Sequence, residues 1–587
     1  MPSVAALLAE RLQSAFDALA PGADPVLRPS DRADFQANGA LALAKRLGRR
    51  PVEVAEAVVA AARLDDVCER VEVSGPGFVN LVLSKAFVEQ SVRSMAEDQR
   101  LGVDPAGAPE RAVVTYSHPN VAKEMHVGHL RSTVIGDALC RMLGHLGHDV
   151  VRENHVGDWG TPFGMLIEHL ADVGEEAAIA ELSVGDLTDF YQTARASFDA
   201  DDAFKERSRR RVVLLQSGDA ETLRLWRVLV EHSIAYFDEV YTKLGVLLTD
   251  DDVKGESFYN SMLADVVSDL AAAGLLVKDG GALCVFPPGF TNREGDPLPL
   301  IVQKSDGGFG YAATDLACIR HRVDSVRATR LLYVVGAPQS QHLQMCFEVA
   351  RMAGWLPAGV TVEHVAFGSV LGADHRMLRT RAGTSVKLVD LLDEAVSRAV
   401  EAMAERGRDS DLAPEERHAV ARALGIGAVK YADLSTDRVR DYVFDWDRML
   451  SFEGDTGPYL QYAHARISSI FRRAASEEPA LAGTGSDGVA ERASTIVIGA
   501  LEERALGLGL LGYAGAVHSA VEESSPSKLC AYLYGLAATF TAFYERCPVL
   551  RAPDEATRRS RLALAETTAR VLAEGLGLLG IEAPERM

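Results

Sequence analysis

The sequence predicts an α/β protein with a parallel sheet, preceded by a small α+β region and followed by an all-helical region. From residue 112 an apolar strand (AVVTY) leads through a loop into an amphipathic helix and a second strand, all within about 40 residues. Such a strand–helix–strand unit places its two strands parallel. Similar apolar strands recur at 300–303, 331–335 and 362–367, and after residue 450 the pattern becomes wholly helical.

The first region, residues 1–105, is predicted to be a small α+β domain. A helix is expected at 39–48, and residues 71–83 alternate like two strands separated by a Gly-Pro-Gly turn. The stretch 102–109 is rich in Gly, Pro and Ala, which marks a linker. A first helix is indicated by apolar residues at helical spacing: Val4, Leu8, Leu12, Phe16 and Leu19.

The middle region, residues 106–450, contains the predicted sheet. A mostly helical, charged stretch at about 175–295 reads as an insertion between its strands. The last region, residues 451–587, is expected to be all helical because its apolar residues fall on stripes. One stripe comprises Leu529, Leu533, Leu536, Phe540 and Phe543, and another Val571, Leu572, Leu576 and Leu579.

Composition narrows the class of protein. The 587 residues are 48% hydrophobic and 25% charged, as in globular proteins, and no run approaches the roughly 20 apolar residues that cross a bilayer. The N-terminal stretch lacks the basic start of a secretory signal, and the seven scattered cysteines form no CxxC. We therefore expect reduced thiols, a cytoplasmic protein and no membrane partner. The 61 basic against 83 acidic residues give a net charge of −22, which does not exclude a local basic face.

The segment 117–130, SHPNVAKEMHVGHL, carries the clearest chemical signal. It joins the end of the first strand to the start of a helix, where unpaired N–H groups and the helix dipole favour phosphate. His126 and His129 flank Val127 and Gly128, and imidazoles can donate to phosphate oxygens. A zinc hydrolase is the alternative for this HxxH, but the HExxH carboxylate and a third ligand are missing.

With further motifs in the same order, this segment resembles the HIGH signature of class I aminoacyl-tRNA synthetases, specifically the arginyl-tRNA synthetase family. The resemblance covers essentially the whole chain. It continues through GDWGTPFG, DGGFGYAATDLA, FGSVLGADHRMLRTRAG, FDWDRMLSFEGDTGPYLQYAHAR and the ending LGIEAPERM. It implies a Rossmann-like doubly wound parallel sheet in 106–450, with a signature loop at 367–383. It also implies a tRNA-elbow module in 1–105 and a helical anticodon-binding bundle in 451–587.

The family reaction joins arginine to ATP as arginyl-adenylate and then transfers arginine to the tRNA terminal 2′-OH. The substrate carboxylate is the nucleophile, so catalysis consists of positioning and charge stabilisation. The resemblance assigns ATP binding and catalysis to Lys123, His126, Gly128 and His129. The second class I signature, KMSKS, is degraded here, and Arg379 or Arg381 is expected to stabilise pyrophosphate; the choice among these and Arg376 stays open.

The resemblance also places the arginine site. Tyr311 and Asp315 match the residues that hold the guanidinium, whose planar donors require a carboxylate acceptor. Asn120 and Gln339 match contacts to the backbone groups of arginine. Thr115 stands where relatives carry an acid, so either another acid substitutes or arginine binds more weakly.

tRNA contacts are expected at both ends of the chain, at Phe35, Asn38, Tyr459, Gln461 and Arg466. Tyr459 and Gln461 are also candidates to relay tRNA binding to the catalytic region, because the family generally needs tRNA to activate arginine. Aromatic side chains can stack on unpaired bases, although Phe78 is expected to be core. Further candidates for phosphate contact, equally readable as solvated faces, are Arg472, Arg473 and the run 205–211.

The expected partners are tRNA(Arg), L-arginine and ATP with Mg²⁺, for a monomer with no protein-bound metal cluster. Two further alternatives stay open. One is a class I synthetase of another specificity, against which Asp315 argues because it favours a cationic substrate. The other is a non-catalytic tRNA-binding paralogue, against which the retained histidines and Lys123 argue.

Overall fold

The computed structural model describes residues 4–30, 32–176, 178, 187–378, 386–405, 412–477 and 491–587. The chain forms two compact units, each with its own core. The first unit comprises Met1–Ala106, Gly407–Ala423 and Ser451–Met587, and the second comprises Gly107–Arg406 and Leu424–Leu450.

The second unit is built on the predicted parallel sheet. Its strand order is β11-β10-β5-β6, and every neighbouring pair is parallel. The chain runs from β5 to β6 on one side and later from β10 to β11 on the other, so the strand order reverses between β5 and β10. Ligands bind at the carboxyl ends of the strands at such a switch point. The strands are β5 (Arg111–Thr115), β6 (Asp149–Glu153), β10 (Arg330–Tyr333) and β11 (Thr361–His364).

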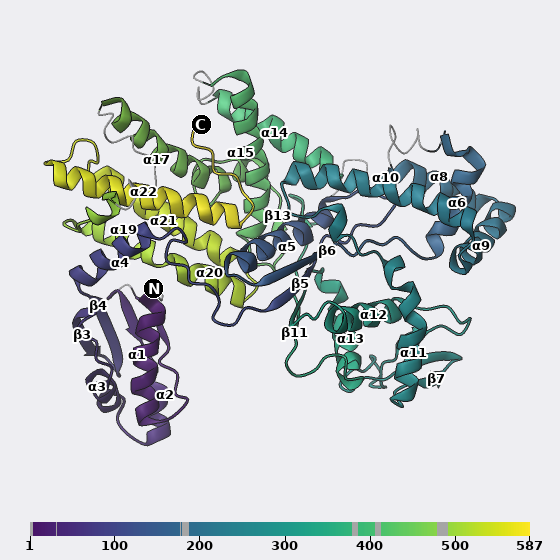
Figure 1. Ribbon diagram of the computed structural model, residues 1–587, viewed down its shortest axis with the longest axis horizontal. Coiled ribbons are helices and arrows are strands. Elements are labelled where there is room, and N and C mark those ends of the chain that lie inside the picture. Colours follow the sequence, from purple (N-terminus) through teal and green to yellow (C-terminus); the bar gives the residue numbers. More distant parts are fainter. Residues whose placement is uncertain are drawn as a thin grey trace. The chain divides into compact units, whose positions relative to one another are not determined.

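Helices connect and cover these strands, as Figure 1 shows for α5, α12 and α13. The connection between β5 and β6 is α5 (Val127–His145), whose predicted apolar face is buried. The connection from β10 to β11 contains the short η3 (Ala337–Gln339) and α13 (Ser340–Met352). Beside α13 packs α12 (Tyr311–Asp324), which precedes β10 in the chain. The two helices share one apolar core through Leu316, Cys318, Ile319, Leu343, Cys346 and Phe347.

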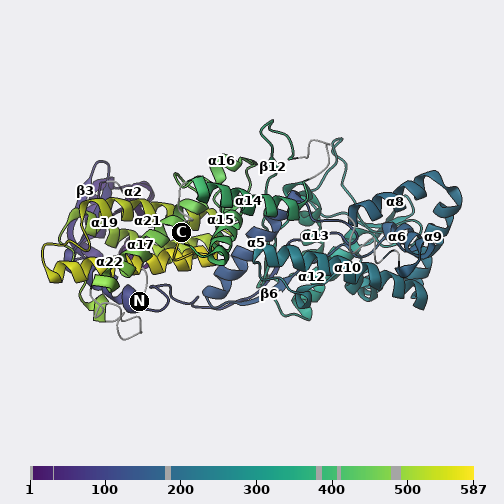
Figure 2. The same ribbon diagram turned by 90° about the horizontal axis from the view of Figure 1, so that it is seen from above.

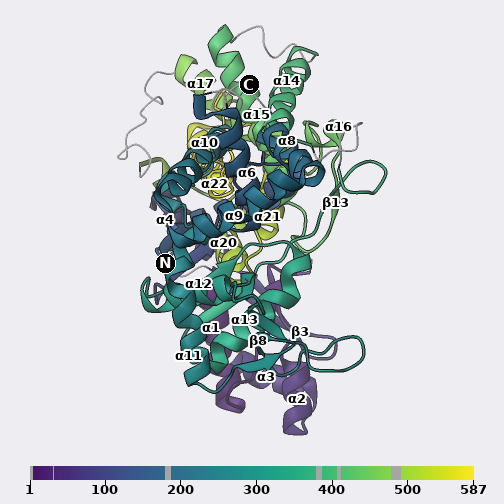
Figure 3. The same ribbon diagram turned by 90° about the vertical axis from the view of Figure 1, so that its right-hand side faces the viewer.

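The predicted insertion is helical over most of its length, and its first helices group together with the helix that precedes it in Figures 2 and 3. They share a core that includes Phe163, Leu166, Phe190 and Leu229. These helices are α6 (Thr161–Val173), α8 (Leu187–Ala200), α9 (Asp202–Ser217) and α10 (Ala220–Leu244). The chain then passes through η1 (Asp250–Asp252) and η2 (Glu256–Met262) to α11 (Leu263–Ala272), which packs on α12 and belongs to the core of α12 and α13.

One strand prediction was wrong in its partner. Residues 300–303 do form a strand, β9 (Leu300–Gln303), but it is not part of the parallel sheet. It pairs antiparallel with β8 (Ala282–Val285), which pairs antiparallel with β7 (Val277–Asp279). A short apolar run gives the same sequence signal in either kind of sheet, and only the hairpin before it distinguishes the two.

The signature loop leaves the sheet after β11 and is supported by short elements. β12 (Val370–Leu371) pairs with β13 (Tyr442–Val443). The remaining helices of this part of the chain are α14 (Leu388–Glu405), α15 (Pro414–Leu434) and α16 (Trp446–Met449). The boundary between the two units falls within α15, after Ala423.

The first unit contains the predicted α+β module, drawn in purple in Figure 1. Its sheet has the order β1-β2-β4-β3, and every neighbouring pair is antiparallel. The strands β3 and β4 are the predicted hairpin. The elements are α1 (Val4–Leu19), β1 (Leu27–Pro29), β2 (Phe35–Ala37), α2 (Ala40–Leu47), α3 (Pro51–Ala61), β3 (Cys68–Ser74), β4 (Phe78–Leu83) and α4 (Lys85–Glu97).

The same unit contains a helical bundle that confirms the predicted stripes. Each residue of the stripe that ends at Phe543 is at most 2% exposed, and each of the four from Val571 to Leu579 is 0% exposed. The helices are α17 (Gly457–Glu477), α19 (Leu501–Leu511), α20 (Tyr513–Glu522), α21 (Ser527–Arg546) and α22 (Glu555–Leu578).

Among the described residues, no helix combines the length and the apolar character needed to cross a bilayer.

Candidate active site at the switch point of the parallel sheet

The loop after β5 has an unusual backbone. Ser117, His118 and Ala122 have φ values of 77°, 55° and 58°. Side chains disfavour this left-handed region, and each such residue costs of order 1–3 kcal/mol unless its surroundings enforce it. Here the enforcement is visible, because the amide of Ser117 donates to Ser132 Oγ at 2.9 Å and that of Ala122 donates to Ser233 Oγ at 2.9 Å. The strained loop is therefore held in place at the carboxyl end of the strand.

His126 and His129 lie together at the N-terminus of α5. Their ring centroids are 4.1 Å apart, and His126 is the N-cap of the helix. His126 Nδ1 accepts from the amide of Gly128 at 3.0 Å, and His129 Nδ1 accepts from the amide of His126 at 3.0 Å. A Cβ at Gly128 would lie 2.7 Å from Cε1 of His126, so the glycine makes room for this ring.

These contacts set the protonation of both rings. Burial lowers the pKa of His129 to about 3, with a smaller contribution from His126. Burial and the charge of Lys123 lower the pKa of His126. Each ring is therefore neutral near pH 7, and since Nδ1 accepts, its proton is on Nε2. The pair presents two neutral N–H donors at a helix N-terminus, which suits phosphate oxygens.

Residues 386–388, which follow the signature loop, pair with this motif. The amide of Val127 donates to the carbonyl of Val386 at 3.0 Å, and the amide of Leu388 donates to that of Met125 at 2.9 Å. Lys387 Nζ lies 3.0 Å from Oε2 of Glu124. Arg376, within the loop, is exposed, whereas Arg379 and Arg381 lie outside the described residues. Lys123 is exposed, and its Nζ lies 4.4 Å from the ring centroid of Tyr191 on α8.

A cavity of about 470 Å³ opens at the same edge of the sheet. It brings together all four residues expected to bind arginine. Tyr311 and Asp315 come from α12, while Asn120 follows β5 and Gln339 follows β10. The other residues lining it are Thr115, His118, His155, Gly157, Glu256, Cys318, Arg322, Tyr333, Val335, Pro338, His342 and Leu343.

Among the described residues that line the cavity, the one arginine, Arg322, is neutralised by a buried ion pair with Glu153. Arg322 Nε and Nη2 donate to the two carboxylate oxygens of Glu153 at 3.0 and 2.6 Å, and Tyr259 donates to Glu153 at 2.8 Å. Burial would raise the pKa of Glu153, but the charge and hydrogen bonds of Arg322 outweigh it and lower the pKa to about 2. The pair is thus ionised, and its charges cancel.

Two acidic groups in the cavity have no such arginine partner among the described residues. Asp315 accepts from, or shares a proton with, His342 Nε2 at 2.6 Å. Glu256 has its pKa raised to about 7 by burial and by the charges of Asp158 and Asp315. Burial lowers the pKa of His118 to about 4 and also lowers that of His155, so these two histidines add no charge at neutral pH, whereas the hydrogen bond to Asp315 raises the pKa of His342. The cavity therefore favours a cation most where Glu256 is ionised and His342 is neutral.

Local contacts hold Asn120 in the wall of the cavity, and Thr115 also lines it. A Cβ at Gly157 would lie 2.3 Å from Oδ1 of Asn120, which explains the first glycine of GDWG. The amide of Val121 donates to the carbonyl of Gly157 at 3.0 Å, so the two loops are tied together. Thr115 is 1% exposed, and its Oγ1 has no hydrogen-bond partner in the described part of the chain. Thr115, which stands where relatives carry an acid, lines the cavity.

The residues expected to contact the tRNA elbow are partly exposed and partly engaged in hydrogen bonds within the module. Phe35 is half-buried on β2, and Phe78, expected to be core, is also only half-buried. The neighbours Gln36 and Asn80 form a buried hydrogen bond of 2.7 Å between β2 and β4. Asn38, with its amide oriented to suit its neighbours, accepts from Arg28 Nε at 2.7 Å. Part of this motif therefore stabilises the module itself.

The expectation for Gln461 needs correction. It is 0% exposed, and its Nε2 donates to the carbonyls of Ala423 and Glu582 at 2.8 Å each. A side chain enclosed in this way supports the helical bundle and offers tRNA no surface. Tyr459 is half-buried with its ring 5.7 Å from that of Tyr534. Arg466 is also half-buried, with its guanidinium 4.5 Å from the ring centroid of Tyr544.

The basic run on α9 is partly neutralised. Arg207 Nε and Arg211 Nε donate to the two oxygens of Glu168 at 2.7 and 2.9 Å. Arg207 also pairs with Asp172, and Arg210 lies 3.4 Å from Glu206. The pairs with Glu168 and Asp172 join α9 to α6. They indicate that these arginines stabilise the helical packing and do not form a free phosphate-binding face. Among the other candidates, Arg473 is exposed, and Arg472 donates to the carbonyl of Glu585 at 2.8 Å.

The sequence reasoning did not single out Glu256 or His342. Neither falls in a motif that was assigned chemistry: Glu256 begins η2 at the end of the insertion, and His342 is on α13. A signal was present for His342, since it follows Gln339 at helical spacing. Nothing in the sequence alone brings Glu256 to the sheet edge.

Comparisons with known proteins agree with this site. A model of the class I tRNA synthetase (R) catalytic domain matches residues 92–446, the DALR anticodon binding domain matches 460–587, and the arginyl tRNA synthetase N-terminal domain matches 3–83. The parallel sheet, the histidine pair and the first of these matches define a class I aminoacyl-tRNA synthetase.

Whole-chain relatives specify the family. The arginine–tRNA ligase of Thermobifida fusca is 55% identical over 585 residues, covering 99% of each chain. That of Frankia casuarinae is 50% identical, covering 98% of this chain and 97% of its own. The crystal structure of arginyl-tRNA synthetase from Plasmodium falciparum superimposes with a TM-score of 0.85 at 29% identity, with 100% of both chains covered. The chain belongs to the arginyl-tRNA synthetase family.

Proposed function

We propose that this protein attaches L-arginine to its cognate tRNA at the expense of ATP. The observation that supports this best is the charge of the cavity. Asp315 and Glu256 offer two carboxylates, and Arg322, the one arginine among the described residues that line the cavity, is already paired with Glu153. Free arginine carries two cationic groups and one carboxylate, so it complements this arrangement.

The residues suggest how arginine is held. Asp315 and Tyr311 lie one turn apart on α12 and face the same space. We assign them to the guanidinium, because a carboxylate and a phenol oxygen both accept from its N–H groups. Asn120 and Gln339 are assigned to the backbone groups of the amino acid. Glu256 supplies an acid in the cavity that Thr115 lines, so it is our candidate to offset the missing carboxylate there.

The first chemical step then needs no protein nucleophile. The arginine carboxylate attacks the α-phosphorus of ATP, the bond to the β-phosphate oxygen breaks, and pyrophosphate leaves. Nε2–H groups of His126 and His129 donate to phosphate oxygens on which charge accumulates. Lys123 and the arginines of the signature loop, Arg379 and Arg381, are assigned to the phosphates, and Mg²⁺ is expected to arrive with ATP.

The second step transfers arginine to tRNA. The terminal ribose hydroxyl attacks the carbonyl carbon of arginyl-adenylate, and AMP leaves with the electrons of the broken bond. We assign the elbow of tRNA(Arg) to residues 1–105 and its anticodon to residues 451–587, with the catalytic domain in 106–450. Phe35, Asn38, Tyr459 and Arg466 remain candidates for tRNA contact, in a protein expected to act as a monomer in the cytoplasm.

The test is ATP–pyrophosphate exchange with each of the twenty amino acids, with and without homologous tRNA. Exchange with arginine alone supports the proposal, and a requirement for tRNA would add the coupling described for the family. Exchange with another amino acid instead would point to a different class I specificity. Folded protein that binds tRNA but supports no exchange would indicate the non-catalytic paralogue.

A further inference from the structure

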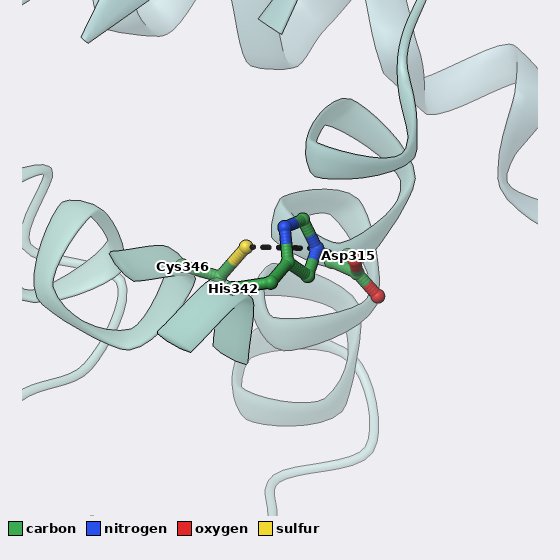
Figure 4. Close-up of side chains that lie close together, drawn as sticks. All are labelled: Asp315, His342 and Cys346. Atoms are coloured by element: carbon green, nitrogen blue, oxygen red, sulfur yellow. Dashed lines mark hydrogen bonds and ion pairs between the residues drawn. The ribbon is translucent and has the colours of Figure 1, made fainter. Parts of the chain in front are cut away.

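Three side chains of different chemistry converge at one side of the cavity (Figure 4). His342 Nε2 lies 2.6 Å from Oδ2 of Asp315 and 3.6 Å from Sγ of Cys346. Each of the three residues offers one ligand atom, and these atoms all lie within 4.8 Å of one another. His342 and Cys346 are one turn apart on α13, whereas Asp315 reaches them from α12.

The trio matches the donors that Zn²⁺ prefers, namely thiolate, imidazole and carboxylate. With Zn–N near 2.0–2.1 Å and Zn–S near 2.3 Å, tetrahedral ligands lie about 3.5 Å apart for nitrogen and sulfur. The observed spacing of 3.6 Å between Nε2 and Sγ already has this value. The 2.6 Å between Oδ2 of Asp315 and Nε2 would have to widen to about 3.3 Å, and the separation of the carboxylate oxygen from Sγ, now within 4.8 Å, would have to be near 3.5 Å.

The three residues lie between the apolar core on one side and the cavity on the other. Cys346 is 0% exposed and belongs to the apolar core shared by α12 and α13. Asp315 and His342 line the cavity, with 24% and 36% of their side chains exposed. An ion there would have three protein ligands and a fourth position toward the cavity that water can fill, the pattern of open zinc sites.

We propose that Asp315, His342 and Cys346 bind a thiophilic divalent cation such as Zn²⁺, and that the bound ion excludes arginine from the pocket. The Cys346 thiol gives its proton to solvent as the metal–sulfur bond forms. Asp315 then coordinates the metal ion and can no longer accept hydrogen bonds from a guanidinium. The ion also places positive charge where the cationic substrate would bind. The exclusion of arginine rests on the proposed function, whereas the metal site does not.

The direct test is a titration of the metal-free full-length protein with Co²⁺, followed by absorption. A thiolate ligand gives a sulfur-to-cobalt charge-transfer band, and this readout needs neither arginine nor ATP. We expect the band in the wild type and in a Cys284→Ala control, which changes another buried cysteine, on β8. It is lost in Cys346→Ala and in Cys346→Ser, and a far-ultraviolet circular dichroism spectrum like that of the wild type shows that this loss is not a folding defect.

The second readout is equilibrium dialysis of labelled arginine with and without Zn²⁺. We expect Zn²⁺ to weaken arginine binding at least tenfold in the wild type and in Cys284→Ala but not in Cys346→Ala. Absence of the thiolate band, or equal effects of Zn²⁺ with and without Cys346, would overturn the proposal. If metal-free protein binds no arginine, the proposed function fails while the cobalt band still decides the metal site.

Discussion

The two ends of the candidate active site are built in different ways. The phosphate end is local, since His126, Gly128 and His129 form their hydrogen bonds within a single helical turn. The amino-acid end is assembled from distant segments, with Asn120, Glu256, Asp315 and Gln339 contributed by separate loops and helices. A local motif can be recognised from a few residues, whereas a pocket of this kind depends on the whole sheet. Substitutions at the two ends should therefore differ in what they change.

The largest effect is expected at the amino-acid end, for Asp315→Asn. Asp315 is half-buried in the free protein, and bound arginine would cover it. Removing one member of such a desolvated charge pair costs about 2–5 kcal/mol, which is a loss of about 30- to 4,000-fold in kcat/KM for arginine. The loss should be carried mainly by KM. Steady-state aminoacylation measures it, with ATP binding as the control that should not change. A change confined to kcat would move Asp315 out of the arginine pocket.

At the phosphate end, His129→Ala should lower kcat by about 100- to 1,000-fold, because it removes a donor to charge that develops in the transition state. The KM for arginine should stay nearly constant, which is the opposite pattern to that of Asp315→Asn. Pyrophosphate exchange at saturating ATP measures this. A kcat that survives the substitution would show that the histidine pair is only structural.

Glu256 should make the affinity for arginine depend on pH, an effect confined to the amino-acid end of the site. With a pKa of about 7, this carboxyl is largely protonated at pH 6 and ionised at pH 8. Only the ionised form attracts a cation, so arginine affinity should rise through this window. His342 acts in the same direction, because its hydrogen bond to Asp315 raises its pKa and its imidazolium form opposes the substrate at low pH.

The measurement is arginine affinity from pH 5.5 to 8.5 for the wild type and Glu256→Gln. The variant should bind arginine about tenfold more weakly at pH 8, corresponding to about 1.4 kcal/mol, and its pH profile should be flatter. Identical profiles would remove Glu256 from the site. Lys254→Gln is a suitable control, since it alters a neighbouring charge outside the cavity lining.

The smallest effect is expected where the two ends meet. In Gly157→Ala the new Cβ would lie 2.3 Å from Asn120 Oδ1 and would push this side chain away. Overpacking costs about 1–3 kcal/mol in a rigid core. Because the nearest atom is a side-chain oxygen of Asn120 that can rotate away, we expect the lower end, about 1 kcal/mol, mainly as a higher KM for arginine. Gly174→Ala is a poor match because its φ is positive, whereas Gly359→Ala has open space and serves as the control. Equal kinetics of the two variants would contradict the assignment of Asn120.

The same contrast explains what the sequence could predict. The strands 331–335 and 362–367 and the helical stripes follow from periodicity, and the structure confirms them. The strand at 300–303 was assigned to the wrong sheet because four apolar residues do not specify a partner. Periodicity reports on residues that are close in sequence, so it does not identify the partner of a strand.

The site shows the same limit. His126 and His129 were identified from their own spacing, but Tyr311 and Asp315 were placed only through the family resemblance. Glu256 was missed because the insertion that carries it returns to the sheet edge only in three dimensions. Gln461 was predicted to contact tRNA, because a glutamine in a helix gives no sign that two distant carbonyls enclose it.

The most direct test of the central claim, that Asp315 selects a guanidinium, compares arginine with citrulline, its neutral isostere. The measurement is the ratio of kcat/KM for the two amino acids in the wild type and in Asp315→Asn. A site whose carboxylate acceptor is covered by the bound substrate should reject the neutral analogue by about 10,000-fold or more in the wild type, and the ratio should shrink sharply in the variant. The same ratio in both proteins would contradict the account.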